Sequence, residues 1–155
     1  MNKMILKEKQ ICLCPKDEKS ERIIPFDVPE GVCRLFITYS YSPKILEDKE
    51  KSYELIKENL IRDAGEDWDK YTDYEEFMPL KNLVTLALCS ADGSYRGAAH
   101  RQADNQHHEI SEEFASPGFV KSKILAGQWS LRLHVHALVT DECICNVKIE
   151  GEVTE

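Results

Sequence analysis

The sequence predicts a mainly β protein: an antiparallel β-sandwich or jelly roll of about eight strands, with one inserted helix at about residues 43–64. Two observations predict the sheets. Apolar and polar residues alternate in short segments along most of the chain, and turn signals such as Asp92-Gly93 separate these segments. A third observation, helical spacing of apolar residues in a single stretch, predicts the helix. We therefore expect one domain, residues 1–155, built from two packed sheets.

Three strands are expected before the helix. Residues 4–14 form the first, and residues 23–28 form the second, where Pro25 indicates an edge strand or a strand entry because proline cannot donate a ladder hydrogen bond. The third, residues 32–41, alternates most clearly. Its inward face should carry Cys33, Leu35, Ile37, Tyr39 and Tyr41.

A helix and a loop are expected to form an insertion at about residues 43–80. Ser42-Pro43 has the pattern of a helix N-cap followed by proline at the first helical position, and Gly65 is a stop signal. The apolar stripe between them consists of Leu46, Tyr53, Ile56 and Leu60. The acidic and aromatic stretch that follows, up to Leu80, has no clear period and is expected to be a loop.

Five more strands are expected after the insertion, at residues 81–89, 95–101, 110–115, 129–139 and 143–149. The first of these is apolar on both faces, which is typical of a central strand. A polar loop at residues 102–108 should precede the third. In the last strand, the inward side chains should be Cys143, Cys145, Val147 and Ile149.

The overall composition restricts the classes of function. A net charge of -8 argues against a nucleic-acid partner, which would require a basic surface, and against binding to an anionic membrane surface. No apolar run approaches the roughly 20 residues of a membrane-spanning helix. The first ten residues also lack the apolar region of a signal peptide. We therefore expect a cytoplasmic protein whose six cysteines are free thiols.

No catalytic motif stands out, and the candidate ligand-binding residues come from two features. Arg96 stands beside Gly97 and near Asp92, where a guanidinium and a bare backbone could meet a carboxylate or a sugar hydroxyl. Alternatively, Arg96 pairs with an internal acid and locks its loop. The aromatic residues of the insertion could form a sugar-stacking platform or could plug one end of the sandwich. The ligand-binding candidates are Trp68, Tyr74, Asp92, Arg96, His100 and Arg101.

Histidines supply weaker candidates for a metal site. His134 and His136 should point to the same face of one strand, and His107 and His108 lie in the expected polar loop. The alternative is that all four histidines are solvated, which fits the lack of a third ligand at a fixed spacing. We expect no bound cofactor.

Two Cys-x-Cys pairs lie near the ends of the chain: Cys12 with Cys14, and Cys143 with Cys145. If the two end strands are neighbours, four thiols could converge on a zinc ion. Structural zinc sites, however, usually separate their cysteines by two to four residues. The alternative is that Cys143 and Cys145 act as small hydrophobic residues on the inward face.

Several turn motifs follow one another between residues 22 and 150. They are Pro25-Phe26-Asp27-Val28-Pro29-Glu30-Gly31, Asn82-Leu83, Asp92-Gly93-Ser94-Tyr95-Arg96-Gly97, Ser116-Pro117-Gly118-Phe119 and Ala126-Gly127-Gln128-Trp129. In this order they resemble the β-sandwich domain that precedes the catalytic domain in PHP-type metallohydrolases of the CehA/McbA group. The resemblance implies a β-sandwich and an accessory role beside a metallohydrolase domain or protein.

The same resemblance supplies no catalytic residues. His134-Val135-His136 has the His-x-His form of a PHP strand, but it lies within the sandwich portion and lacks the downstream His, Asp and Glu ligands. The resemblance therefore implies a non-catalytic accessory or interaction module, similar to the domain that precedes PHP-type metal-dependent phosphoesterase domains. A jelly-roll module that binds a carbohydrate or another small polar ligand is the alternative, and a small metal-binding protein is a third hypothesis.

Overall fold

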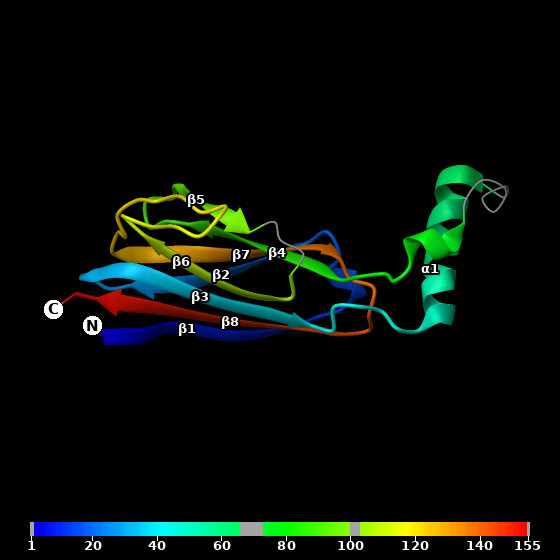
Figure 1. Cartoon of the computed structure of the whole chain (residues 1–155), viewed down its shortest axis with the longest axis horizontal. Helices are drawn as coiled ribbons and strands as arrows, with labels where there is room; N and C mark the ends of the chain where they lie inside the picture. Colours follow the sequence, from blue (N-terminus) through cyan, green and yellow to red (C-terminus); the bar gives the residue numbers. More distant parts are fainter. Residues whose placement is uncertain (1, 66–72, 100–102, 155) are drawn as a thin grey trace.

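The computed structural model describes residues 2–65, 73–99 and 103–154. Within these ranges the chain forms eight strands in two antiparallel four-stranded sheets and one α-helix, which confirms the predicted β-sandwich (Figure 1). One sheet has the strand order β1-β8-β3-β6 and the other β2-β7-β4-β5. The strands are β1 (Asn2–Leu13), β2 (Glu21–Val28), β3 (Val32–Ser42), β4 (Leu83–Cys89), β5 (Tyr95–Ala99), β6 (Asn105–Ser111), β7 (Gly127–Ala137) and β8 (Cys143–Val153).

The core lies between the two sheets and is filled by the inward side chains of alternating strands. In β7, Trp129, Leu131 and Leu133 are at most 1% exposed, while the residues between them are partly exposed. The expected inward faces of β3 and β8 are likewise found, apart from Cys33, which is only half-buried. Each fully buried large apolar side chain contributes about 1.5–3 kcal/mol. The alternation that is visible in the sequence therefore supplies the apolar side chains of the core.

Two predicted strand positions are confirmed by the strand order. β2 is an edge strand, so the missing N–H of Pro25 leaves no gap in the interior of a sheet. β4 lies between β7 and β5, and its residues Val84, Leu86 and Leu88 are at most 1% exposed.

The helix begins later than predicted. Helix α1 spans Lys49–Ala64, and its N-cap is Asp48, whose side chain accepts a hydrogen bond from the Lys51 N–H over 3.1 Å. The segment assigned to the first helical turns instead pairs with the chain entering β4, where Ile45 forms a bridge with Lys81. Pro43 does not start the helix, because the backbone of residues 44–46 hydrogen-bonds to residues 80–82 on the other side of the insertion.

The boundaries of a loop and a strand between residues 105 and 115 were predicted incorrectly. Residues 105–111 form strand β6 rather than a loop, and the chain turns after Ser111 instead of continuing as a strand. Alternation is hidden in β6 because two of its buried side chains, Gln106 and His108, are polar. They hydrogen-bond to each other over 2.8 Å, and Gln106 also donates to the Ala103 carbonyl. Burial of polar residues that satisfy one another leaves no apolar period to detect.

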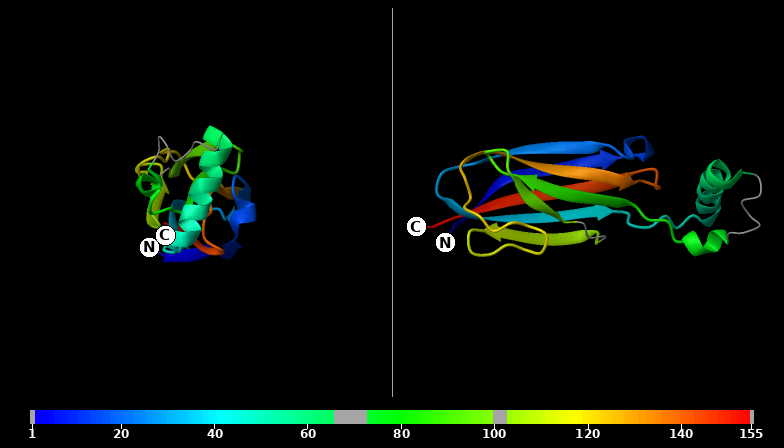
Figure 2. Two further views of the ribbon diagram at one scale, coloured as in Figure 1. Left: turned by 90° about the vertical axis from the view of Figure 1, so that its right-hand side faces the viewer. Right: turned by 90° about the horizontal axis from the view of Figure 1, so that it is seen from above.

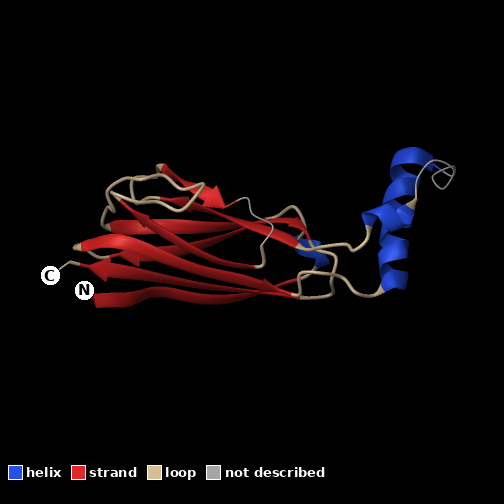
Figure 3. Cartoon of the chain, in the orientation of Figure 1, coloured by secondary structure: helices blue, strands red, loops and turns tan. Residues whose placement is uncertain are grey.

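Helical structure gathers at one end of the sandwich (Figure 3). Besides α1, there are short 3-10 helices at Pro15–Asp17 and Tyr74–Phe77. Seen from above in Figure 2, α1 stands beyond the ends of the strands, and both chain termini lie at the opposite end. We call residues 43–80 the arm; its described parts are 43–65 and 73–80.

Candidate functional site

The arm is fixed to the sandwich by a buried asparagine at its base. The Asn82 side chain, fully buried, donates to the Pro43 carbonyl over 2.9 Å and to Thr140 Oγ1 over 2.8 Å. Its carbonyl oxygen accepts from the Val139 N–H over 2.7 Å. One amide thus joins both ends of the arm to the connection between β7 and β8, so the arm has a defined position.

The helix and the 3-10 turn of the arm hold each other through aromatic contact. The rings of Tyr53 and Tyr74 meet edge to face, with centroids 4.7 Å apart. On the side of α1 that is turned inward, Ser52 and Ile56 are buried. Tyr74, a predicted ligand-binding residue, is therefore half-buried and used in packing. Trp68, its predicted partner in a sugar platform, lies outside the described residues.

An apolar cavity of about 340 Å³ lies between the arm and the end of the sandwich. Its walls come from α1, the turn at Pro15, the segment before β4 and the connection between β7 and β8. Apolar side chains predominate in the lining; they are Pro15, Leu55, Ile56, Leu60, Phe77, Leu80, Leu138 and Val139. This size and lining fall within the range of ligand sites and of pockets that receive a partner's side chain.

The arm is strongly acidic. Residues 43–80 contain twelve acidic and six basic residues, a net charge of -6, whereas the whole chain carries -8. At the cavity, Lys51 is paired with Asp141 of the β7–β8 connection. Glu18 and Asp63 line the same cavity and have no ion-pair partner among the described residues. The uncompensated charge at this site is therefore negative.

Arg96, the central ligand-binding candidate, is buried and engaged with backbone. It is 3% exposed, and its guanidinium donates to the carbonyls of Val120, Ser122 and Lys123 over 2.9–3.2 Å. The same group lies 5.2 Å from the ring centre of Trp129. Burial lowers the Arg96 pKa, although the group remains charged at neutral pH. The arginine locks a loop, as the alternative expected, but through carbonyl oxygens rather than an internal acid.

The loop that Arg96 holds, residues 116–125, bridges the edge strands of the two sheets. On β5, the Ala98 N–H donates to the Gly118 carbonyl over 3.1 Å. On β6, the Ser116 N–H donates to the Glu109 carbonyl over 2.9 Å. This loop therefore closes one long side of the sandwich.

The other described ligand-binding candidates, Asp92 and Tyr74, form neither an ion pair nor a hydrogen bond with Arg96. Asp92 is exposed, and its side chain accepts from the Ser94 N–H over 2.9 Å within the turn. The hydrogen bonds from Ser94 lower the Asp92 pKa. No ion pair joins Asp92 to Arg96, although the structure describes both residues. His100 and Arg101 lie outside the described residues.

The four histidines proposed as weak metal candidates are distributed over different faces. His107 is exposed on the outside of one sheet, whereas its neighbour His108 is buried beside Phe119. On the outside of the other sheet, His134 lies 3.4 Å from a Glu21 oxygen. His136 shares that face, with its ring centre 6.2 Å from that of His134. Within residues 2–65, 73–99 and 103–154, no three metal-ligating side chains cluster.

The two Cys-x-Cys pairs do not converge, although β1 and β8 are neighbours. Leu13 pairs with Cys143 in the ladder, so the inward face of β1 places leucine beside that thiol. Cys12 points outward and is exposed, while Cys143 and Cys145 are buried. The hydrogen bond to Cys143, together with burial, raises the Cys145 pKa and keeps that thiol protonated. The register offsets the two pairs by one residue, so Cys12 lies opposite Ile144 and the four thiols do not meet at one point.

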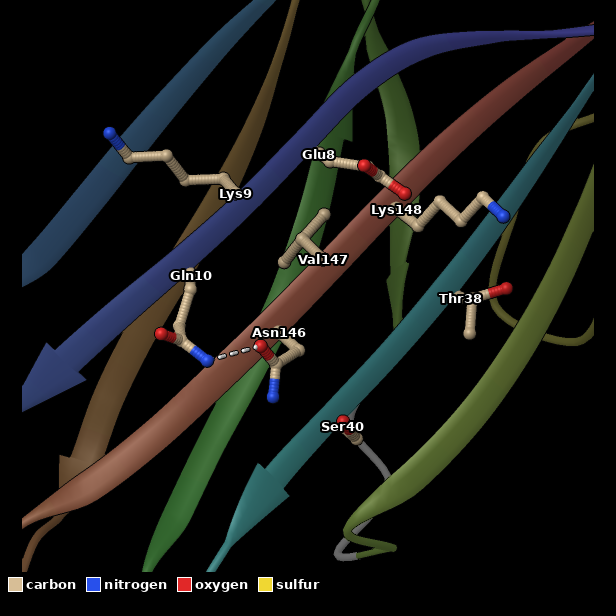
Figure 4. Close-up of a pocket in the computed structure, with 8 residues that line it drawn as sticks. All are labelled: Glu8, Lys9, Gln10, Thr38, Ser40, Asn146, Val147 and Lys148. Atoms are coloured by element: carbon tan, nitrogen blue, oxygen red, sulfur yellow. Dashed lines mark hydrogen bonds between the residues drawn. The ribbon is translucent and has the colours of Figure 1, made fainter.

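A shallow polar recess of about 330 Å³ lies on the outer face of the β1-β8-β3-β6 sheet (Figure 4). Gln10 donates to the Asn146 side-chain oxygen over 3.0 Å, and the hydroxyls of Thr38 and Ser40 stand on the neighbouring strand. Lys9 points away from these groups. Amides and hydroxyls that share one face can exchange hydrogen bonds with a polar ligand.

The chain was compared with sequence models of known protein families and with curated proteins. Neither comparison gave a match. The β-sandwich therefore rests on the structure, and the likeness to the PHP-associated domain rests on the turn motifs alone. Among the described residues, α1 is too short and too polar to cross a bilayer, and no other helix is longer.

The cavity residues were the part of the site that sequence reasoning missed. The helical stripe contained Ile56 and Leu60, which both line the cavity. Phe77, Leu138 and Glu18 come from three separate segments, and no spacing in the sequence brings them together. The detectable signal was the uneven charge, because the insertion carries most of the acidic excess.

Proposed function

We propose that this chain is a non-catalytic β-sandwich module that binds a partner protein through its arm, as an accessory module of a metal-dependent phosphoesterase would. The observation that carries the proposal is the arm itself, an acidic helical projection with an apolar cavity at its base. A module of this kind needs a rigid body and an exposed contact surface, and the sandwich and the arm supply them.

The length of the arm supports a role in binding. β3 ends at Ser42 and β4 begins at Leu83, and the chain between them contributes little to the core between the sheets. Connections in compact domains usually have about 4–6 residues, and much longer ones are commonly functional. An elaborate connection held at a fixed base by Asn82 is therefore suited to presenting a surface to another molecule.

The nature of the partner is suggested by the turn motifs described above. They resemble the domain that accompanies PHP-type catalytic domains, which makes a metal-dependent phosphoesterase the favoured partner. The chain termini and the arm lie at opposite ends of the sandwich (Figure 1). A partner on the arm would therefore not obstruct either terminus.

Site-specific photo-crosslinking in cells of the native host tests this function. A photoreactive phenylalanine analogue at Phe77, which is 47% exposed on the arm, should give one reproducible protein adduct. The matched control is the same analogue at Ile23, which is 56% exposed on β2. We expect mass spectrometry to identify a metallohydrolase in the adduct from Phe77 and not in the adduct from Ile23.

Two results would contradict the proposed function. One is an identical adduct pattern from both positions, which would mean that the arm has no specific contact. The other is phosphoesterase activity of the purified chain that disappears on chelation and returns with added metal, because the chain would then be an enzyme itself.

A small-ligand module remains the second candidate, and the polar recess is the observation that favours it. Gln10 and Asn146 form a hydrogen-bonded amide pair beside two hydroxyls, which is suited to a carbohydrate or another polyhydroxy ligand. Tyr74, the described ligand-binding candidate of the expected aromatic platform, does not contribute to this recess, because it packs against Tyr53 at the far end of the molecule.

Titration of the labelled protein with a panel of mono- and disaccharides, followed by NMR, tests this candidate. One sugar should shift the resonances of β1, β3 and β8, and the double variant Gln10→Ala/Asn146→Ala should weaken its binding about tenfold or more. His136→Ala, on the outside of the other sheet, is the control and should bind normally. A panel without a binder, or equal binding by the double variant, counts against a sugar site.

A further inference from the structure

The cavity beside α1 is lined mainly by apolar side chains, so filling it with water is unfavourable. Leu60 and Phe77 expose apolar surface into a space of about 340 Å³, whereas the sandwich core is tightly closed. Apolar surface that is held open in this way is typical of an interaction site, because covering it is favourable. The volume is suited to one or two large apolar side chains rather than to a whole secondary-structure element.

The charge around the cavity restricts what can cover it. Glu18 on the sandwich and Asp63 on α1 line the cavity without ion-pair partners among the described residues. Lys51, the basic residue of the lining, is already paired with Asp141. The described parts of the arm, residues 43–65 and 73–80, contain nine acidic and five basic residues, a net charge of -4. An occupant with acidic groups would be repelled, and an occupant with basic groups would be attracted and its association accelerated.

We propose that the cavity receives a basic segment of a partner protein, which inserts a large apolar side chain between α1 and the sandwich and places lysines or arginines beside Glu18 and Asp63. This inference rests on the proposed interaction function and specifies the chemistry of the partner. The apolar anchor provides affinity, and the basic residues provide selectivity and a salt-dependent association rate. The same negative charge disfavours an anionic membrane as the occupant.

Selection of 16-residue peptides from a phage-displayed random library against the whole chain provides the test. We expect enriched peptides to combine one large apolar residue with several lysines or arginines. Their affinity, measured by fluorescence anisotropy, should fall at least about tenfold for Glu18→Gln/Asp63→Asn and should decrease with salt for the wild type. Phe77→Ala should weaken binding similarly, and it should not prevent folding because the side chain is 47% exposed.

The control variant is Glu8→Gln/Glu150→Gln, which removes the same number of charges from the outer face of the β1-β8-β3-β6 sheet. The affinity of this variant for the selected peptides should be within about twofold of the wild type. Charges on the outer sheet face lie away from the cavity, and salt screens their effect on a peptide bound there. Circular dichroism and thermal unfolding verify that each variant is folded before its binding is measured.

Three outcomes would overturn the inference. They are enrichment of acidic or neutral peptides, equal binding by the cavity variants and the wild type, and a selection that enriches no peptide. In the last case, titration with decyltrimethylammonium chloride and sedimentation of the chain alone would identify a small cation or a second copy as the occupant. A partner-specific crosslink at Phe77 together with any of these outcomes would retain the interaction function and reject only the basic partner.

Discussion

Replacement of Arg96 by alanine should cost about 3–5 kcal/mol of unfolding free energy, a large part of the 5–15 kcal/mol typical of a domain. The guanidinium makes four hydrogen bonds to three carbonyls of the 116–125 loop, and a hydrogen bond to a charged donor contributes about 1.5–3 kcal/mol. Water can reach some of these carbonyls in the variant, which keeps the cost below the full sum. Urea denaturation followed by tryptophan fluorescence measures it.

Two further variants separate the role of Arg96 from a general effect of losing an arginine. Arg96→Lys keeps the charge but loses the planar guanidinium, so its free energy of unfolding should lie between those of Arg96→Ala and the wild type. Arg22→Ala removes a 44% exposed arginine paired with Asp17, and it should cost about 0–1 kcal/mol. If Arg96→Ala is no more destabilising than Arg22→Ala, the loop does not depend on this side chain.

The second large effect is expected at Gly97. An added Cβ would lie 2.3 Å from the Gly118 carbonyl oxygen and 2.5 Å from the Phe119 Cα, and both atoms belong to backbone that cannot yield easily. Gly97 also has a φ of +112°, which other residues rarely adopt. We expect Gly97→Ala to cost about 3 kcal/mol or more, or to prevent folding.

Gly93 provides the matched control for this prediction. It also has a positive φ, +83°, but an added Cβ would meet nothing within 4 Å. Gly93→Ala should therefore pay only the conformational cost, about 1 kcal/mol. Comparison of the two urea midpoints isolates the contribution of close packing between β5 and the 116–125 loop. Equal destabilisation by both variants would show that backbone conformation, and not contact, makes Gly97 necessary.

The fold class was predictable because most strands alternate between a core face and a solvent face. β3 and β7 have long runs of this kind, and they supply the three largest fully buried side chains among the described residues, Trp129, Tyr39 and Tyr41. β6 was missed since Gln106 and His108 satisfy each other inside the sandwich. The helix start was misplaced since the backbone around Ile45 pairs across the insertion, which propensity at Pro43 does not reveal.

The site was less predictable than the fold for a physical reason. A glycine beside an arginine suggested a binding motif at Arg96, but burial against Trp129 converts that motif into a loop anchor. Conversely, the cavity is formed by four segments whose proximity depends on the position of the arm. Its residues are ordinary apolar side chains, which have no motif of their own and acquire a role only through packing.

The arm and the chain termini lie at opposite ends of the sandwich, so the sandwich acts as a spacer between them. Strand β8 runs for 11 residues along the molecule, and at about 3.3 Å per residue it extends roughly 36 Å. A domain joined to either terminus would thus be held about one strand length away from a partner protein bound to the arm. Because the two packed sheets form a rigid body, the sandwich would fix both the distance and the relative orientation of the partner on the arm and a domain joined to a terminus.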